Sequence, residues 1–224
     1  VREQKDQISA LISDISHQTK TPVANLQLYA QLLLEQPLTA QGKDCAAAIS
    51  AQAEKLQALI EALVKTSRLE TGILVLHPQL GEITPVVERA VAQYAPKAGE
   101  KGIVLTTRQT EGFAVFDPKW TEEAVCNLLD NALKYSKEHG EIRVTLQQVQ
   151  NKKTLKVYNT GKGIPESEKE KIFQRFYRSD ASRARATGGY GLGLSIAQSI
   201  ANAHKIRIQV ESEYEHWICF ILTF

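Results

Sequence analysis

The first stretch of the chain places mostly hydrophobic residues at alternating steps of four and three. These positions are Ile8, Ile12, Ile15, Thr19, Pro22, Leu26, Tyr29 and Leu33. Such spacing is the heptad seam of a helix that packs against other helices. We therefore expect one long helix from the N-terminus to about Gln36, where Pro37 halts it.

A second helical pattern begins between Thr39 and Lys43, and we expect Gly72 to cap its C-terminus. Its repeating positions are Ile49, Ala53, Leu56, Ile60, Leu63 and Ser67. Two such helices joined by a short link form an antiparallel hairpin. The hairpin has too little mass to bury both seams, so we expect a homodimer whose four helices form a bundle. Packing of the hairpin on the downstream domain is the alternative.

Beyond Gly72 the pattern mixes strand-like and helical stretches, which places a domain boundary near residues 72–79. We expect helices at 85–94, 118–135 and 192–203, and strands at 103–108, 113–116, 141–149, 154–159, 205–211 and 216–223. A long polar loop with one short helix should fill residues 160–189. The predicted fold class is α+β, with a helical hairpin over residues 1–72 and an α/β two-layer sandwich over residues 73–224.

Composition fits a soluble protein with one large or two small domains: 224 residues, 43% hydrophobic and 23% charged. The net charge of +2 gives no reason to expect a nucleic-acid partner. Cys45, Cys126 and Cys219 lie far apart, so neither a disulfide framework nor a zinc site is indicated, and a reducing compartment fits best. The chain has no run of about 18 apolar residues and no signal peptide, so we expect a soluble piece of a longer protein.

One histidine stands out on the first predicted helix. At about 100° per residue, His17 falls roughly 180° from Ile8 and should point into water. Pro22 has no N–H to give to the carbonyl of Gln18, so the helix should bend or loosen one turn beyond the histidine. An exposed imidazole beside a helix defect is a candidate nucleophile, and an ordinary surface histidine is the alternative.

Two amides, Asn127 and Asn131, are spaced to share one face of the helix predicted at 118–135, with Lys134 a further turn along. Asparagine is unfavourable inside a helix, so two of them on an apolar helix indicate a ligand. Side-chain amide oxygens suit Mg²⁺, which shares its remaining positions with water and phosphates. The alternative is that both amides bond to neighbouring loops.

Two glycine-rich turns follow. In residues 159–165, Gly161 and Gly163 let the backbone turn tightly against a flat ligand, although a plain hairpin turn would have the same composition. The glycines of residues 188–194 open a helix and expose backbone N–H groups that can bind phosphate. The stretch before them is polar rather than strand-like, and the chain has no GxxxxGK[ST] sequence, which argues against dinucleotide-binding and P-loop folds.

Taken together, these segments resemble the sensor histidine kinases of two-component systems. Residues 17–22 read His-Gln-Thr-Lys-Thr-Pro and resemble the phosphoacceptor box, His-Glu-x-x-Thr/Asn-Pro. Residues 127–135 resemble the N box, 159–165 the G1 box, 172–178 the F box and 188–194 the G2 box. The resemblance covers nearly the whole chain, because the boxes follow one another in the family's order and on fitting elements.

The resemblance implies ATP and Mg²⁺ as cofactors, held between the Asn127 helix and a lid over residues 160–189, with transfer of the γ-phosphate to an imidazole nitrogen of His17. It implies Asn131 as the direct magnesium ligand, assisted by Asn127, while Lys134 or Tyr135 touches the phosphates. The other implied nucleotide contacts are Asn159, Gly161, Gly163, Ile164, Arg175, Gly189, Gly191, Leu192 and Gly193.

The same resemblance implies that the phosphohistidine donates to an aspartate on the receiver domain of a response regulator. Thr21 stands at the position linked to dephosphorylating that regulator, so phosphatase activity is also implied. Leu28 lies within about 20° of His17 on the same helix face and is expected to belong to the regulator's docking patch. The family further implies the cytoplasmic portion of a membrane-anchored bacterial sensor, which would meet the membrane only through segments outside this sequence.

Two positions depart from the family pattern. Gln18 replaces the acidic residue thought to accept the imidazole proton, and an amide cannot act as that base, so autophosphorylation should be slow. Asn159 replaces an aspartate that binds adenine, and without charge assistance ATP binding should weaken by roughly 1 kcal/mol. Both departures leave open a second interpretation, in which a degenerate kinase serves mainly as a nucleotide-binding dimeric scaffold or phosphatase.

Overall fold

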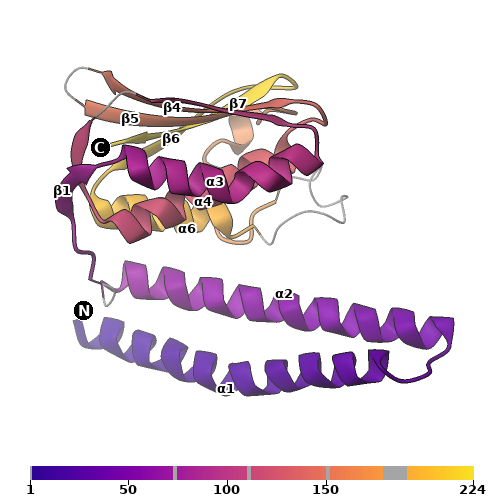
Figure 1. Cartoon of the computed structure of the whole chain (residues 1–224). Coiled ribbons are helices and arrows are strands. Elements are labelled where there is room, and N and C mark those ends of the chain that lie inside the picture. The colour runs from indigo at the N-terminus through magenta and orange to yellow at the C-terminus, as the bar shows by residue number, and fades with distance from the viewer. Residues whose placement is uncertain (1, 73–74, 110–111, 150–151, 179–190) are drawn as a thin grey trace. The chain divides into compact units, whose positions relative to one another are not determined.

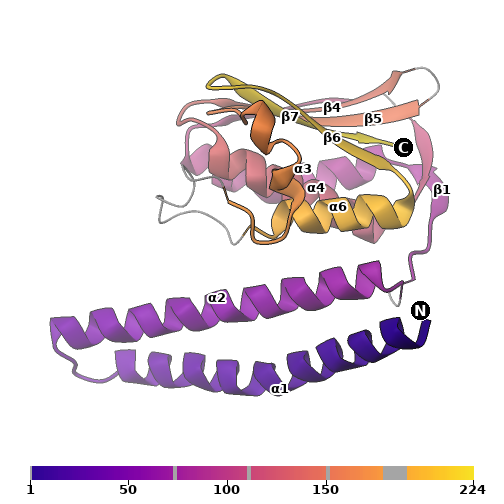
Figure 2. The same ribbon diagram turned by 180° about the vertical axis from the view of Figure 1, so that it is seen from behind.

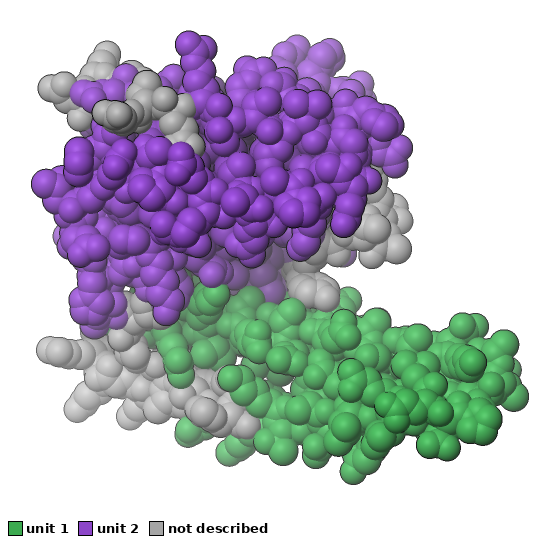
Figure 3. Space-filling view, viewed as in Figure 1, with its two compact units in different colours: residues 1–74 green, residues 75–224 purple. Residues whose placement is uncertain are grey.

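The computed structural model describes residues 2–72, 75–109, 112–149, 152–178 and 191–224. The chain divides into two compact units, Val1–Leu74 and Val75–Phe224, which are coloured green and purple in Figure 3. Among the described residues, no helix combines the length and the apolar character that a membrane crossing needs.

The first unit is a hairpin of two long helices, α1 (Arg2–Leu34) and α2 (Ala40–Glu70), which run side by side in Figure 1. The helical N-terminal region is therefore confirmed. α2 begins where the Thr39 side chain accepts a hydrogen bond from the Gly42 backbone N–H at 3.2 Å, a typical N-cap. Past its other end, Gly72 has a φ of 72°, the left-handed conformation that commonly follows a helix.

α1 continues through Pro22 as one helix. Its ribbon bows along its length in both views (Figures 1 and 2), so the helix bends without breaking. One turn before the proline, the Thr19 hydroxyl donates to the Ile15 carbonyl oxygen at 2.6 Å, the back-bonding that often accompanies a bent helix.

Several buried positions on the two helices carry small side chains, whereas the large seam residues Ile60 and Leu63 are only half-buried. Val23 and Ala30 are buried on α1, and Ala46 and Ala53 on α2. Of the predicted seam residues, the large ones that remain exposed are Ile15, Leu26, Tyr29, Leu33, Ile49 and Leu56. This agrees with the expectation that a single hairpin cannot bury both seams: small side chains occupy buried positions, and these six large seam residues stay on the surface of the single chain.

The second unit is built on a five-stranded sheet in the order β2-β4-β5-β7-β6. Its strands are β2 (Val104–Gln109), β4 (Glu141–Val149), β5 (Lys152–Thr160), β6 (Arg207–Glu213) and β7 (Trp217–Thr223). Only the β2–β4 pair within it is parallel. The helices α3 (Thr84–Glu100), α4 (Pro118–Tyr135) and α6 (Gly193–His204) cover one face (Figures 1 and 2), which confirms the predicted α/β two-layer sandwich.

The core lies between this sheet and its helices. On β4, the side chains of Ile142, Val144 and Leu146 are buried in the core, whereas Arg143, Thr145 and Gln147 between and after them are more exposed, as a period of two requires. The helices contribute residues such as Val125, Leu128, Leu129, Ala197 and Ala201. This packing positions α4 and α6, the two helices that carry the glycine and amide motifs.

Three elements differ from the sequence-based expectation. β1 (Gln79–Glu82), which was missed, pairs antiparallel with β3 (Phe113–Phe116) in a separate two-stranded sheet. α3 runs six residues past Tyr94 and through Pro96, because buried Ala98 holds its last turn while the exposed backbone near Ala92 can meet water. Within its described part, residues 160–178, the expected loop holds two single turns of 3₁₀ helix, η1 (Glu166–Glu168) and η2 (Lys171–Phe173), rather than an α-helix.

Candidate nucleotide site

α4 begins where the sequence predicts, because Asp117 caps it. The Asp117 carboxylate accepts hydrogen bonds from the backbone N–H groups of Lys119 and Trp120 at 3.1 and 3.2 Å, and from that of His77 at 2.9 Å. The Asp117 N–H in turn donates to Nε2 of His204 at 3.0 Å. His204 ends α6, so this bond ties the two helices that carry the site. Sequence reasoning missed His204, because nothing in the local pattern distinguishes it from a surface residue.

Asn127 lies on α4 with its amide held in one orientation. Its Nδ2 donates to the Glu123 carbonyl oxygen at 2.8 Å and lies 3.4 Å from the Glu123 carboxylate. The oxygen Oδ1 faces Gly193, where an added Cβ would come within 3.1 Å of it. The structure therefore brings Asn127 of the predicted N box close to Gly193, the first residue of α6.

The other predicted residues of α4 lie further along the same helix. Asn131, Lys134 and Tyr135 are all half-buried. Lys134 forms an ion pair with Asp130, one turn before it. The carbonyl of Tyr135 lies so close to Gly161 that a side chain at that position would collide with it. The end of α4 is therefore in contact with the first glycine turn.

Asn159 is fully buried near the end of β5. Its Nδ2 donates to the Thr160 carbonyl oxygen at 3.2 Å. Its Oδ1 is buried and has no hydrogen-bond partner among the described residues. A buried acceptor without a partner is costly, so a donor group of a ligand would be expected to satisfy it.

The turn after Asn159 is fixed by backbone bonds. The Gly161 N–H donates to the His216 carbonyl at 3.0 Å, and Gly161 forms an isolated bridge with Ser136. Gly163 has a φ of 70° and lies against the backbone of Glu213, so no other residue fits there without strain. The Ile164 N–H donates to the Ser212 hydroxyl at 2.8 Å. Both glycines of the predicted motif are thus required by the fold.

The F box and the second glycine turn meet at one point. The Phe176 N–H donates to the Gly191 carbonyl oxygen at 2.9 Å, and Gly191, with a φ of 72°, packs against the same segment. Leu192 is buried and Arg175 is half-buried. Gly193 is the first residue of α6. Gly189 lies outside the described residues.

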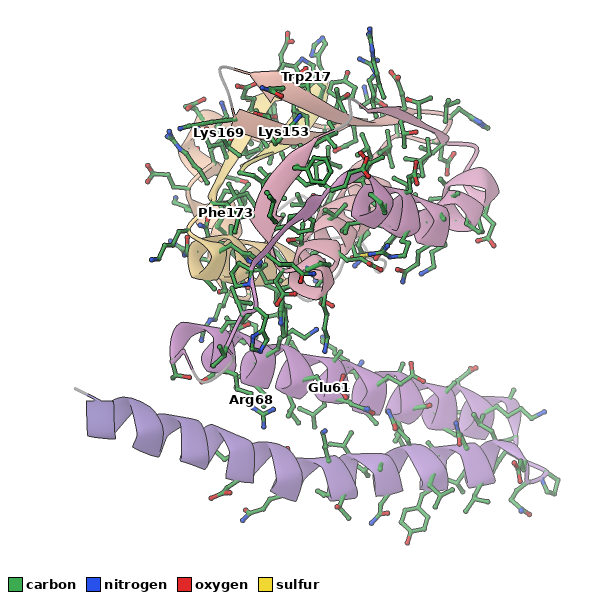
Figure 4. All side chains as sticks on the ribbon, turned by 60° about the vertical axis from the view of Figure 1, so that its left-hand side comes forward. Glu61, Arg68, Lys153, Lys169, Phe173 and Trp217 are labelled. Atoms are coloured by element: carbon green, nitrogen blue, oxygen red, sulfur yellow. The ribbon has the colours of Figure 1, made fainter. Side chains whose placement is uncertain are left out.

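The aromatic residues of the F box separate into two roles. Phe173, labelled in Figure 4, comes from η2 and packs edge-on against Phe220 of the sheet, with ring centroids 6.4 Å apart. Phe176 is 52% exposed and has a φ of 62°, an unusual conformation for a bulky residue. One aromatic therefore belongs to the core and the other stays at the surface.

The predicted phosphoacceptor segment lies on α1. Gln18, Thr21 and Leu28 are exposed. His17 lies within α1, but its side chain is outside the described part of the structure, so its orientation toward water stays a prediction.

A groove of about 650 Å³ lies between α3 and α4. It includes Asn127 and has polar walls that include Arg89, Glu122 and Asp130. The Cys126 thiol also lines it, and burial together with Glu122 and Glu123 raises the pKa of this thiol to about 11, so it stays protonated near neutral pH. Neither Asn159 nor the glycines of the first turn line this groove, so it is separate from the predicted adenine contacts.

Two family models match the chain. The model described as "His Kinase A (phospho-acceptor) domain" matches residues 7–72. The model described as "Histidine kinase-, DNA gyrase B-, and HSP90-like ATPase" matches residues 116–224. The first match covers the hairpin from residue 7 onward, and the second begins just before α4 and contains all the predicted nucleotide contacts.

A similar curated protein is "Sensor protein SrrB" of Staphylococcus aureus (strain MRSA252), 28% identical over 214 residues. That match covers 94% of this chain and 37% of the relative, so the chain spans little more than a third of the curated relatives it matches.

Two solved structures share the fold over nearly the whole chain. Full-length ShkA in complex with AMPPNP has a TM-score of 0.79 at 22% identity, covering 96% of this chain and 45% of ShkA. Histidine kinase ThkA in complex with response regulator protein TrrA has a TM-score of 0.69 at 21% identity, covering 100% of this chain and 63% of ThkA.

Proposed function

Because this chain belongs to the sensor histidine kinases, with their phosphoacceptor and ATPase domains in one polypeptide, we propose that it binds Mg-ATP and phosphorylates His17. The observation that carries the nucleotide part of the proposal is the buried, unpartnered Oδ1 of Asn159 beside a turn that only glycines can form. The solved structure of ShkA, which shares this fold, holds AMPPNP.

The residues around Asn159 fit an adenine ring. Oδ1 would accept a hydrogen bond from the exocyclic amino group, and Nδ2 is already engaged with the Thr160 carbonyl. Gly161 and Gly163 let the turn pack tightly against the backbones of Tyr135 and Glu213, which holds Asn159 in place, and we propose that Ile164 adds an apolar contact to the base. Bound ATP supplies the phosphoryl group; the protein supplies its placement.

We infer that Mg²⁺ and the phosphates lie toward Asn127, Asn131 and the start of α6. Amide oxygens are suitable magnesium ligands, and the Asn127 oxygen already faces Gly193. The N-terminus of α6 presents backbone N–H groups at the positive end of the helix dipole. The remaining proposed phosphate contacts are Lys134 or Tyr135, Arg175, Gly189, Gly191, Leu192 and Gly193.

The acceptor in the proposed reaction is a nitrogen of the His17 imidazole. A bond forms between this nitrogen and the γ-phosphorus as the bond to the ADP oxygen breaks, and the imidazole proton must leave. Gln18 is exposed beside His17 but has no basic group to take that proton. We therefore expect Gln18→Glu to raise the autophosphorylation rate about a hundredfold, the low end of what a general base contributes. An unchanged rate would mean that another group acts as the base.

We further propose that the phosphohistidine donates to an aspartate of a response-regulator receiver domain, and that Thr21 supports dephosphorylation of that regulator. ThkA, which shares the fold, was solved with response regulator protein TrrA. The exposed large residues of α1 and α2 fit pairing with a second copy into a four-helix bundle, which would bury them. Leu28 is exposed and available to a regulator.

The proposal is tested by incubating the protein with γ-³²P-labelled ATP and Mg²⁺. We expect an acid-labile label on His17 that His17→Gln abolishes. His216→Gln serves as the matched control, because His216 is exposed and lies in the other unit. Saturable ATP binding without any label on His17 would favour the scaffold or phosphatase function, to which Gln18 and Asn159 point. Absence of ATP binding would reject both.

A further inference from the structure

The contact between α1 and α2 contains one polar layer. On α1, Gln27 lies between buried Val23 and buried Ala30, and on α2, Gln57 follows buried Ala53 by one turn. The Gln27 Nε2 donates to the Gln57 Oε1 at 3.1 Å, although the two residues are 30 positions apart in the chain. This bond therefore crosses between the helices within an otherwise small and apolar contact.

The polar layer continues along α2. The Gln57 Nε2 donates to the Glu61 carboxylate at 3.0 Å, and Glu61 is labelled on α2 in Figure 4. Both groups of the Gln57 amide are thus engaged, its oxygen by Gln27 and its nitrogen by Glu61. The second bond determines which way the Gln57 amide faces, so its oxygen is presented to α1 rather than its nitrogen.

The small residues in the contact between α1 and α2 would allow the two helices to pack at more than one axial offset. Alanines such as Ala30, Ala46 and Ala53 give a nearly smooth surface, in contrast to large side chains that interlock in one arrangement. A directed hydrogen bond is different, because sliding one helix by a single turn separates its partners by about 5.4 Å. A polar pair within a helical interface is a known way to specify register at a cost in stability.

We propose that Gln27 and Gln57 set the axial register of α1 against α2 and thereby position His17. His17 and Gln27 lie on the same continuous helix, α1. His17 precedes Gln27 by ten residues, which is about 15 Å along the helix axis. A shift at Gln27 is therefore carried along α1 to the phosphoacceptor. Gln27 and Gln57 act on the reaction only through the placement of His17, so they are positioning residues. This role rests on the proposed function, whereas the register itself does not.

The register is tested with Gln27→Leu/Gln57→Leu, which removes both amides and leaves no unpaired partner. The matched control is Gln31→Leu/Gln52→Leu, two exposed glutamines on the same helices. Nitroxide labels are placed on cysteines introduced at exposed Asn25 and Lys55, with Cys45, Cys126 and Cys219 replaced by serine, and labelled chains are diluted with unlabelled ones. Pulsed electron paramagnetic resonance then measures the distance between the helices' labels.

We expect one narrow distance in the parent and in the control, and a distribution that is broadened or displaced by about 5 Å in the double-leucine variant. If the double-leucine variant gave the same distance distribution as the parent, the proposed role of Gln27 and Gln57 in the register would be overturned. We also expect autophosphorylation of His17 to fall about tenfold or more without a lower thermal midpoint, since small misplacements cost rate steeply. An unchanged rate in a variant with an altered register would overturn the positioning role. Failure of the parent itself to phosphorylate His17 would reject the proposed function, and the distances would still decide the register.

Discussion

The two units of this protein differ in the residues that each one buries in its interior. In the second unit, the sheet and three helices bury large side chains such as Phe116, Leu128 and Phe220 around one core. In the hairpin, the buried residues among those described are mainly small, such as Ala30 and Ala46, and residues as large as Leu26 stay 49% exposed. The second unit therefore has a core of its own, whereas the hairpin leaves apolar surface that the proposed second copy would cover.

The difference fits the division of labour that we propose. A nucleotide site needs fixed donors and acceptors, which a close-packed core supplies. A phosphoacceptor helix must present one side chain to different partners, and a hairpin with a small internal contact leaves most of its surface available for that. Four substitutions test this comparison, in order of decreasing expected effect.

The largest effect is expected from the core of the second unit. Phe220→Ala should reduce the free energy of unfolding of that unit by about 3–5 kcal/mol, because it leaves a cavity between the sheet and η2. Urea unfolding followed by tryptophan fluorescence measures the change, since Trp120 and Trp217 both lie in this unit. Val23→Ala in the hairpin is the comparison and should leave that transition unchanged. Similar losses from both substitutions would contradict the contrast between the units.

In the hairpin, a surface substitution should matter more than a buried one. Leu26→Asp places a charge on the exposed seam, so we expect the proposed dimer to weaken at least tenfold while helix content is retained. Analytical ultracentrifugation gives the dissociation constant, and circular dichroism gives the helix content. Asn25→Asp, which changes an exposed neighbour to the same acid, is the control. An unaltered dimer would show that Leu26 lies outside the interface.

A smaller effect is expected at the nucleotide site. Asn159→Asp restores a charged acceptor at a position whose oxygen lacks a partner among the described residues, and ATP should bind about fivefold more tightly, or about 1 kcal/mol. Isothermal titration calorimetry with Mg-ATP measures it. Asn202→Asp on the exposed surface of α6 is a matched control. Equal affinity in both variants and the parent would mean that Asn159 does not contact the base.

The smallest effect concerns the end of α6. Lys205 has a φ of 58°, a left-handed conformation that glycine adopts without strain. Relief of this strain is partly offset by the greater backbone entropy of glycine in the unfolded chain, so Lys205→Gly should stabilise the second unit by about 0.5 kcal/mol, as measured by its urea transition. Lys101→Gly is the contrasting variant, because Lys101 ends α3 with a φ of −92° and glycine has no advantage there. A loss at both positions would show that backbone strain at Lys205 is not relieved.

Local patterns were sufficient for most of the elements. The heptad spacing identified both long helices, and the Asp117–Pro118 start of α4 was predicted to the residue because capping is a local interaction. β4 was also predicted to the residue, since alternation along one strand reports that one face is buried. β1 was missed because its four residues are mostly exposed, with Leu80 at 72%, and only pairing with β3 makes it a strand.

In the candidate site, too, local motifs pointed to some residues, and only the tertiary structure revealed others. The motifs named Asn127, Asn159 and the glycines of both turns, because each carries a chemical requirement that can be seen in a few residues. They did not reveal His204, whose contribution is a bond to a residue 87 positions away.

By itself, the amino-acid sequence indicated most of the helices and strands in their order and the residue types available for the proposed nucleotide chemistry, because periodicity and capping act over a few residues. Only the tertiary structure decided that Leu26 and other large seam residues stay exposed in the single chain, that Asn159 is buried with its oxygen unpartnered among the described residues, and that the Asn127 amide faces Gly193. These outcomes depend on which distant surfaces meet, and packing between distant segments is not recorded in any local pattern.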